Sequence, residues 1–292
     1  MNRDRMPERA APVTAGKVRE ITAISNPLVK EIRALALKKY RDQSRRFVAE
    51  GLKLVTDALE KEWPVHYLVH AKSASDQPAL QAAAARARAR GATILETTAK
   101  VLGAITRRDN PQTAIGVFSQ RWLEIGDIRP ATGELWIGLD RVRDPGNLGT
   151  ILRTADAFGA SGIILIGDCT DPFSLEAVRA TMGSIFHVPL ARASEAQFLP
   201  WRAGWPGSVV GTHLSGAADF RSFAYGEGPV LLLMGNEQQG LTPALAGACN
   251  ALLRIPMSGE ADSLNLAVAT ALVAFHIRQR YLPPIGAGAG NS

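Results

Sequence analysis

Three segments of the chain carry polar side chains directly after apolar runs that have the composition of buried strands. The segments read DRVRDPGNLGTILRTADAFGA (140–160), GNEQQGL (235–241) and PMSGEADSLNL (256–266). Their candidate functional side chains are a guanidinium, a carboxylate, a hydroxyl and two amides, contributed by Arg153, Glu237, Ser263, Asn147 and Asn265. In open α/β sheets, ligands bind at the carboxyl ends of the strands. These residue types therefore predict a site that positions a polar or anionic ligand.

Local signals place the asparagines and the serine near the starts of helices. The DPGN turn precedes a helix expected over 147–158, and Asn147 is expected to cap it by accepting from free backbone N–H groups. Ser263 is expected to begin the last helix, roughly 263–281, so that Ser263 and Asn265 lie in its first turn. The positive end of the helix dipole there favours an anion.

Each of these patterns also fits an ordinary structural role, such as a capped helix or a strand that ends in a polar turn. Gly235 gives a further indication of a ligand-binding site, because a residue without Cβ lets another molecule approach the backbone closely. Taken singly, no segment identifies a function.

The elements that position these segments alternate between strands and helices in both halves of the chain. In the second half we expect strands at 135–139, 163–167, 209–214, 230–235 and 251–255, and helices at 147–158, 174–182, 243–249 and 263–281. In the first half we expect strands at 46–51, 65–69, 92–96 and 114–120, and helices opening at 26 and covering 52–61, 79–90 and 98–105. This pattern alone indicates a doubly wound parallel sheet with a smaller α/β domain before it.

Composition and punctuation predict five segments. They are a disordered basic leader over 1–21, a small α/β domain over 22–120, a linker over 121–134, a larger domain over 135–282 and a flexible tail over 283–292. No window has 18 uncharged apolar residues, so we expect no membrane span. The two cysteines, Cys169 and Cys249, cannot form a zinc cluster and are expected to pack as reduced, small hydrophobes in a cytoplasmic protein.

Several common catalytic signatures are absent from the sequence. There is no GxGxxG after a strand, no GxxxxGK[ST], no HExxH and no GxSxG. The five histidines do not cluster at ligand spacing, so we expect no metal site. The missing glycine fingerprint disfavours a dinucleotide-dependent oxidoreductase, which the alternating pattern would otherwise allow.

The net charge of +6 lies entirely in the first fifty residues, which hold 12 basic and 6 acidic side chains. The remaining residues carry equal numbers of both signs. A charge excess confined to one end of a chain indicates a polyanionic partner.

The three polar segments, in this order, resemble the three motifs of the SpoU (TrmH) family of RNA ribose 2′-O-methyltransferases. The N-terminal stretches SNPLVKEIRALALKKYRDQSRRFVAEGLKLV (25–55) and ITRRDNPQTAIGVF (105–118) resemble that family's substrate-binding domain, so the similarity covers nearly all of 22–281. The resemblance implies a C-terminal α/β-knot, a deep trefoil built on a parallel sheet, with a smaller N-terminal α/β RNA-binding domain. It also implies a homodimer formed through the knot domain, with the active site built across the interface.

The resemblance implies S-adenosylmethionine as the cofactor, held largely by the backbone of three loops. The corresponding residues are Thr212, His213, Leu214, Gly235, Asn236, Ile255, Met257 and Leu264. Arg153 matches the arginine proposed to help deprotonate the ribose 2′-hydroxyl, Asn147 lies beside it, and Glu237, Ser263 and Asn265 match the other motif positions. Because a guanidinium keeps its proton in proteins, we expect Arg153 to polarise the hydroxyl and orient the neighbouring phosphate instead.

The basic N-terminal region fits an RNA partner, since Lys and Arg provide salt-dependent affinity for phosphates. The residues expected to bind RNA are Lys30, Arg33, Lys38, Lys39, Arg41, Arg45 and Arg46. The two-domain architecture favours ribosomal RNA as the substrate. A transfer RNA substrate is the alternative within the same class, and a catalytically silent RNA-binding or ribosome-assembly factor is the alternative outside it.

Overall fold

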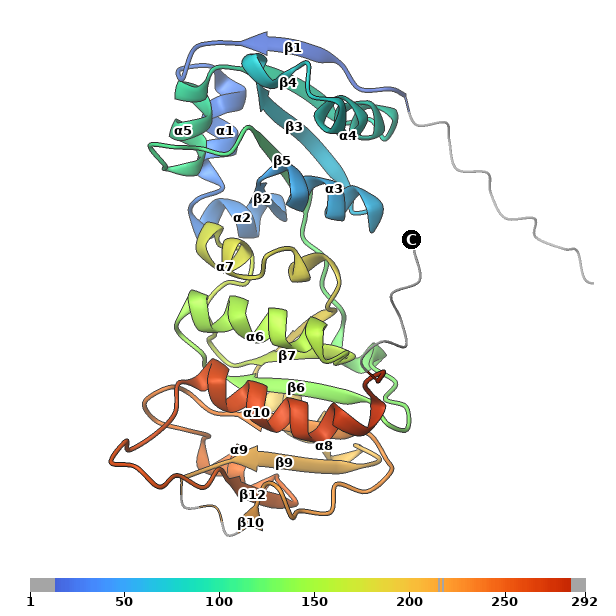
Figure 1. Ribbon diagram of the computed structural model, residues 1–292, viewed down its shortest axis with the longest axis vertical. Helices are drawn as coiled ribbons and strands as arrows, with labels where there is room; N and C mark the ends of the chain where they lie inside the picture. Colours follow the sequence, from blue (N-terminus) through green and yellow to red (C-terminus); the bar gives the residue numbers. More distant parts are fainter. Residues whose placement is uncertain (1–13, 215, 217, 285–292) are drawn as a thin grey trace, which may run out of the picture. The chain divides into compact units, whose positions relative to one another are not determined.

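A computed structural model describes residues 14–214, 216 and 218–284. The chain divides into two compact units between Ser119 and Gln120, one residue before the expected boundary at 120/121. Each unit contains its own sheet (Figure 1). None of the helices that the structure describes combines the length and apolar character needed to span a membrane.

The N-terminal unit is built on a five-stranded sheet in the order β1-β4-β3-β5-β2. β1, β4 and β3 run parallel, whereas β5 pairs antiparallel with both β3 and β2. Its strands are β1 (Val18–Ile21), β2 (Arg46–Glu50), β3 (Val65–Ala71), β4 (Thr93–Thr97) and β5 (Ala114–Ser119). Its α-helices are α1 (Pro27–Ala34), α2 (Lys38–Ser44), α3 (Leu52–Glu60), α4 (Pro78–Ala89) and α5 (Ala99–Thr106).

One sequence expectation for this unit is wrong in detail, and one expected helix proves short. The leader expected over 1–21 does not extend to Ile21, because β1 pairs in parallel with β4 at the edge of the sheet. Residues 1–13 of that leader lie outside the described residues. The helix that opens at Pro27 ends at Ala34, and Leu37 adopts an extended conformation before α2 begins. A three-residue break therefore separates the basic residues of α1 from those of α2.

The C-terminal unit is built on a seven-stranded sheet whose paired strands all run parallel, in the order β10-β12-β9-β11-β6-β7-β8. Its strands are β6 (Leu135–Asp140), β7 (Gly162–Ile166), β8 (Leu190–Ala193), β9 (Ser208–Thr212), β10 (Ala218–Asp219), β11 (Val230–Met234) and β12 (Ala251–Arg254). Its α-helices are α6 (Pro145–Ala157), α7 (Leu175–Ala180), α8 (Glu195–Ala203), α9 (Pro243–Gly247) and α10 (Leu266–Arg278). Every residue of β6, β7 and β11 is buried, as the apolar runs predict for a sheet covered on both faces.

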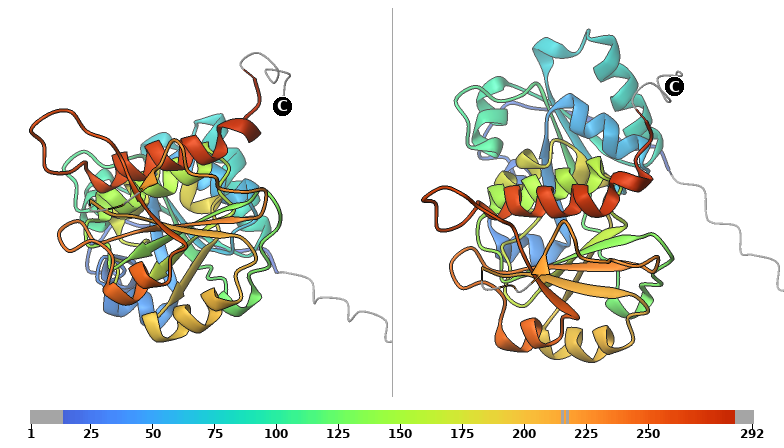
Figure 2. Two further views of the ribbon diagram at one scale, coloured as in Figure 1. Left: turned by 90° about the horizontal axis from the view of Figure 1, so that it is seen from below. Right: turned by 60° about the horizontal axis from the view of Figure 1, so that its bottom comes forward.

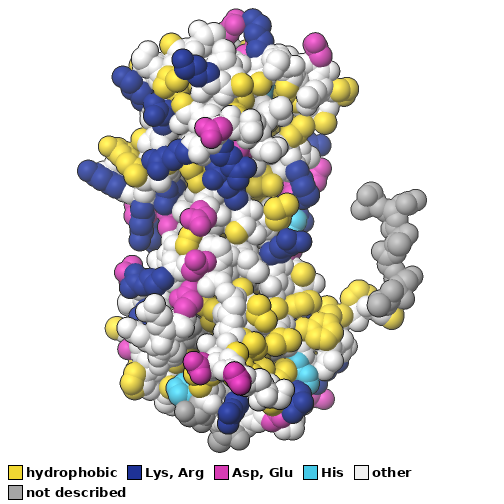
Figure 3. Space-filling view, turned by 60° about the vertical axis from the view of Figure 1, so that its left-hand side comes forward, with side chains coloured by type: hydrophobic (Ala, Val, Ile, Leu, Met, Phe, Trp, Pro, Cys, Tyr) yellow, Lys and Arg dark blue, Asp and Glu magenta, His cyan; other side chains and the backbone are white. Residues whose placement is uncertain are grey.

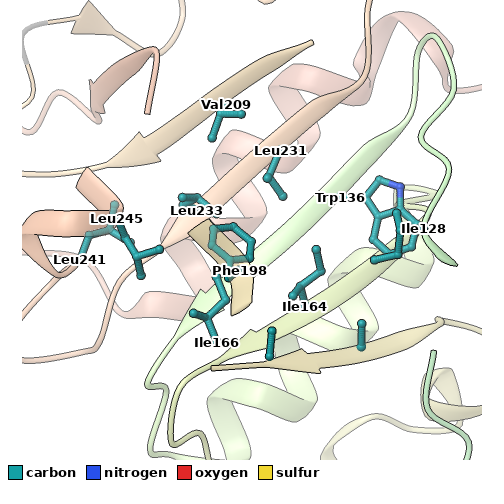
Figure 4. Close-up of a cluster of buried hydrophobic side chains, with 12 residues drawn as sticks. Ile128, Trp136, Ile164, Ile166, Phe198, Val209, Leu231, Leu233, Leu241 and Leu245 are labelled. Atoms are coloured by element: carbon teal, nitrogen blue, oxygen red, sulfur yellow. The ribbon is translucent and has the colours of Figure 1, made fainter. Parts of the chain in front are cut away.

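Helices cover both faces of this sheet. α6 and α10 pack against each other on one face, and α8 and α9 lie on the other (Figure 2). On the α8 face, Phe198 and Leu245 pack onto Ile164, Leu231 and Leu233 of the central strands (Figure 4). β8, α8 and the two-residue β10 were not expected from the sequence.

The segment expected to be a linker, 121–134, is packed into the C-terminal unit. Leu123 forms a parallel bridge with Ala191, and Ile128 belongs to the buried cluster on the α8 face. Of the tail expected over 283–292, residues 285–292 lie outside the described residues.

Candidate active site

The three polar segments leave the sheet at one edge. β6, β11 and β12 end at Asp140, Met234 and Arg254, and all three strands run in the same direction. β9, which ends at Thr212, lies between β11 and β12. The loops that follow these strands are therefore neighbours, as expected for the ligand-binding edge of a parallel sheet.

Glu237, Asn147 and Asn265 form one hydrogen-bonded cluster at this edge. The Asn147 amide Nδ2 donates to Glu237 Oε1 at 3.3 Å, and Asn265 Nδ2 donates to Asn147 Oδ1 at 2.9 Å. Each of the three residues comes from a different polar segment, so hydrogen bonds between side chains link the three segments.

The Glu237 carboxylate also binds the backbone at the start of α6. Its Oε2 accepts from the backbone N–H of Arg143 and its Oε1 from that of Asp144, both at 3.3 Å. A carboxylate that accepts several N–H bonds fixes the chain that donates them. Glu237 thus sets the conformation of the turn that carries Asn147.

The two asparagines hold different helix positions from those expected. Asp144 is the N-cap of α6 and accepts from the backbone N–H of Asn147 at 2.6 Å, so Asn147 lies inside the first turn. α10 begins at Leu266, and Asn265 caps it by accepting from the N–H groups of Ala267 and Val268. Ser263 lies before the helix. Because Asp144 caps α6 and Asn265 caps α10 through its oxygen, the Asn147 side chain and the Asn265 Nδ2 group are available for the cluster.

Arg153 and Ser263 do not join this cluster. Among the described residues, neither side chain makes a hydrogen bond or ion pair, and both are exposed. The helical repeat explains the first case, because six residues turn a helix by about 240° and advance it by about 9 Å. Asn147 and Arg153 consequently face different sides of α6.

The residues expected to hold the cofactor line the same edge. Thr212 donates through Oγ1 to Met234 Sδ at 3.5 Å, and the backbone N–H of His213 donates to the Leu253 carbonyl at 2.9 Å. The remaining apolar members are exposed or half-buried, namely Leu214, Met257, Ile255 and Leu264. Apolar side chains next to backbone polar groups suit a ligand with a flat heterocycle and a polar chain.

Gly235 is required by the loop itself. A Cβ at Gly235 would lie 2.2 Å from the Gly240 carbonyl carbon, so the close approach is made by the loop's own backbone. Asn236 and Gly240 exchange two backbone hydrogen bonds across this loop. The Asn236 side chain turns inward, donating to the Arg141 carbonyl at 2.8 Å and accepting from the N–H of Gln238.

Sequence reasoning missed the role of Arg141. Its guanidinium binds both oxygens of the buried Asp140 carboxylate at 2.8 and 3.0 Å and also donates to Gln239 Oε1 and the Gly240 carbonyl. The carboxylate of Asp140 raises the pKa of Arg141 above its usual range. Arg141 therefore clamps the end of β6 to the loop that carries Glu237. The sequence signal that could have indicated this role is the adjacent Asp and Arg at the end of a buried strand.

The residues expected to bind RNA lie in the N-terminal unit, where Lys and Arg side chains gather in the upper part of Figure 3. Five are exposed: Lys30, Arg33, Lys38, Lys39 and Arg45. Arg46 is half-buried and pairs with Glu31 at 3.1 Å. Arg41 is buried, with Nη1 donating to the Leu35 carbonyl at 2.8 Å, so its expected contact with RNA is replaced by a structural role.

Two further exposed arginines follow a helix that packs against α1. α1 packs against α5, at whose end Arg107 and Arg108 are exposed. These two arginines lie about 70 residues from the basic run in the sequence, so only the packing of α1 on α5 points to them. Among the described residues, no group of three or more His, Cys, Asp or Glu side chains is placed so that it could hold a metal ion.

Comparisons with known proteins match this architecture. Residues 134–275 match the model of the SpoU rRNA methylase family, and residues 26–116 match the MRM3-like substrate-binding domain. The chain is 29% identical to the 23S rRNA (guanosine(2553)-2′-O)-methyltransferase RlmP of Bacillus subtilis, over 89% of this chain and 100% of that protein. It is 31% identical to the 23S rRNA (uridine(2479)-2′-O)-methyltransferase of Streptomyces viridochromogenes, over 84% of this chain and 87% of that protein.

A solved structure agrees with these matches. The AdoMet-bound rRNA methyltransferase from Sinorhizobium meliloti is 54% identical, covers 92% of this chain with 100% of its own, and gives a TM-score of 0.87. This confirms the expected fold class, an α/β-knot domain on a parallel sheet with a smaller N-terminal α/β domain. The chain belongs to the SpoU rRNA methylase family.

Proposed function

We propose that the protein is an S-adenosylmethionine-dependent RNA methyltransferase that methylates a ribose 2′-hydroxyl in ribosomal RNA. The observation that carries this proposal is the cluster of Asn147, Glu237 and Asn265 at the edge where the loops after β9, β11 and β12 meet. The names of the relatives support the reaction and the class of RNA. A relative of 54% identity binds AdoMet, which supports the cofactor.

The three loops would hold the cofactor with groups that fit it. Backbone groups at Thr212–Leu214, 235–236 and 255–264 suit the polar parts, while exposed Leu214 and Met257 suit the adenine ring and the aliphatic chain. S-adenosylmethionine supplies an electrophilic methyl group on a sulfonium, so the reaction needs neither a metal nor a covalent enzyme intermediate. The chain's task is to bring an oxygen nucleophile into line.

The cluster suits this positioning task. Glu237 fixes the turn before α6, and the Asn147 amide is held from both sides, by Glu237 and by Asn265. Positioned groups of this kind orient the ribose, and orientation alone can lower a barrier by up to about 7–11 kcal/mol. In such a transfer the 2′-oxygen would form the bond to the methyl carbon as the carbon–sulfur bond breaks, which would release the sulfur as a neutral thioether and pass the hydroxyl proton to water.

Arg153 is assigned to the same reaction, with its guanidinium polarising the hydroxyl and orienting the adjacent phosphate. Because Arg153 is exposed on α6 and apart from the cluster of its own chain, the proposal includes a site completed by Arg153 of the partner subunit. Ser263 is assigned to the neighbourhood of the reacting groups, on the loop that leads to Asn265.

A homodimer through the knot domain is supported by the surface of α10. Val268, Leu272 and Phe275 follow one another at helical spacing, and their side chains are 50%, 42% and 47% exposed. A stripe of large apolar residues on an exposed helix face indicates a protein interface. α6, which carries Arg153, packs beside this helix.

The N-terminal unit is proposed to bind the RNA through Lys30, Arg33, Lys38, Lys39, Arg45 and Arg46, joined by Arg107 and Arg108. Its family-model match is to a substrate-binding domain. A ribosomal RNA substrate also fits the expected cytoplasmic location. A transfer RNA substrate stays the second candidate within the class.

Incubation with S-adenosylmethionine labelled in its methyl group tests the proposal. Unmodified ribosomal RNA and unmodified transfer RNA, both transcribed in vitro, are offered separately. We expect label in ribosomal RNA. Label in transfer RNA alone would overturn the choice of substrate. RNA binding without any transfer would favour the silent assembly factor instead.

A further inference from the structure

We propose that Arg143 binds a phosphate of the RNA substrate beside the active-site cluster, and that its ion pair with Asp168 is a resting contact that the phosphate replaces. This inference rests on the proposed function and deepens it by assigning a substrate contact in the catalytic domain. The two residues follow neighbouring strands, Arg143 after β6 and Asp168 after β7.

The backbone of Arg143 is fixed within the cluster while its side chain extends into solvent. Its N–H donates to Glu237 Oε2 at 3.3 Å, and the next residue, Asp144, caps α6. The Arg143 side chain is 60% exposed. Arg143 therefore combines an anchored backbone with an accessible guanidinium, four residues before Asn147.

The ion pair with Asp168 is one that a phosphate can displace. Arg143 Nη1 lies 2.8 Å from Asp168 Oδ2, and the Asp168 side chain is 73% exposed. Exposed pairs of this kind add little to stability. Among the hydrogen bonds of the described residues, the Arg143 guanidinium takes part in this one only, so further N–H donors are left for a ligand.

Arg141, two residues earlier, provides the contrast. Its guanidinium is bound to the buried Asp140, Gln239 and the Gly240 carbonyl, so its donors already serve the protein. Two arginines at the same edge of the sheet therefore have different roles. Arg141 holds the loops together, and Arg143 presents a guanidinium outward.

Phosphate is the ligand chemistry that fits this position. A planar guanidinium matches two phosphate oxygens, and every ribose 2′-hydroxyl in an RNA strand lies next to phosphates. The Asp168 carboxylate carries the same sign of charge as the phosphate, so it both occupies Arg143 and repels the RNA backbone. The two partners of this ion pair should therefore have opposite effects on RNA binding.

The test compares Arg143→Gln and Asp168→Asn in the full-length protein, with ribosomal RNA transcribed in vitro as the probe. Equilibrium RNA binding and the KM for RNA are measured over a range of salt concentrations. For Arg143→Gln we expect about tenfold weaker binding and a salt slope reduced by about one phosphate contact. For Asp168→Asn we expect binding several-fold tighter than wild type.

Matched controls are Arg129→Gln and Asp127→Asn, which make the same charge changes at exposed positions in the segment leading into β6. We expect both to bind RNA within about twofold of wild type. Thermal melting and S-adenosylmethionine binding, measured on all four variants, establish that the fold and cofactor site are intact.

Two outcomes would overturn the proposal. Weaker binding by both Arg143→Gln and Asp168→Asn would make the ion pair a structural bridge. An Arg143→Gln effect no larger than that of Arg129→Gln would reduce Arg143 to bulk charge. Because binding is read separately from turnover, a protein that binds RNA without transferring methyl would refute the proposed function and still decide the role of Arg143.

Discussion

Asn265 Nδ2 donates to Asn147 Oδ1 across 2.9 Å, although 118 residues separate the two in the sequence. The same Asn265 side chain caps α10 through its oxygen, which accepts from the backbone N–H groups of Ala267 and Val268. One amide therefore starts the last helix and joins it to the first turn of α6. The oxygen of the Asn265 amide should therefore affect stability, and its nitrogen should affect activity.

Replacing Asn265 should separate these two roles. Asn265→Ser keeps a side-chain oxygen that can cap α10 but removes the Nδ2 donor, so we expect near wild-type stability with reduced methyl transfer. Asn265→Ala removes the cap as well and should cost about 1 kcal/mol of unfolding free energy. Urea denaturation and methyl-transfer rates check both. Equal stability losses for the two variants would contradict the capping role.

Replacing Glu237 with Gln should loosen the turn before α6. The carboxylate accepts from the N–H groups of Arg143 and Asp144 and from Asn147, whereas an amide directs one NH₂ group at these donors. We expect a loss of about 1–3 kcal/mol together with impaired methyl transfer. Gln238→Glu, which adds a charge at the next position, is the control. Hydrogen exchange at 143–147 that stays as slow as in the wild type would refute the argument.

The basic residues of α2 should divide into two classes. Arg41 is buried and donates to the Leu35 carbonyl, so Arg41→Ala should cost about 1–3 kcal/mol of stability by leaving that carbonyl unpaired. Lys38→Ala and Lys39→Ala should leave stability unchanged and weaken RNA binding with a smaller salt dependence. Denaturation and filter binding on the three variants distinguish the classes. A stable Arg41→Ala protein with weakened RNA binding would reverse the assignment.

The assignment of Arg153 to the partner subunit can be tested by complementation. Arg153→Ala and Glu237→Ala should each abolish activity in a homodimer. Coexpressed in equal amounts, they should recover about a quarter of wild-type activity, because half of the dimers are mixed and each mixed dimer has one intact site. No recovery despite demonstrated mixed dimers would place both residues in one subunit's site.

Alkaline pH should destabilise the fold through Cys169. Burial raises the pKa of its thiol to about 11, above the usual value of about 8.5. The folded state thus holds the proton more tightly than the unfolded state. The resulting stabilisation is complete below pH about 8.5 and is lost as the pH rises towards 11, by on the order of 3 kcal/mol. Urea denaturation at rising pH should show a shallower decline for Cys169→Ala, and identical declines would contradict this.

Much of the fold follows from the sequence because its signals are local. The apolar run at 230–235 and the alternation of strands with helices predict a parallel sheet, and the structure contains β11 at Val230–Met234 within one. β8, at Leu190–Ala193, is short and interrupted by the exposed Arg192, so its signal is weak. The knotted topology came only from the family resemblance, since no local pattern encodes how a chain threads.

The sequence predicts which residues belong to the candidate site, but it does not predict how they contact one another. Asn147, Glu237 and Asn265 could be named from their motifs, whereas their mutual hydrogen bonds depend on the ends of strands and helices. α6 begins earlier than expected because a second capping residue is present. Asp144 precedes Pro145 and caps the helix in place of Asn147. The burial of Arg41 was unpredictable because it depends on the break in the helix before α2.

The position of the transferred methyl group on the RNA distinguishes ribose methylation from base methylation. Ribosomal RNA is incubated with the protein and methyl-labelled S-adenosylmethionine, then hydrolysed in alkali, which spares a bond next to a methylated 2′-oxygen. We expect label in an alkali-resistant dinucleotide at one position, and no label with Glu237→Ala. Label recovered in ordinary mononucleotides would mean methylation of a base and would contradict it.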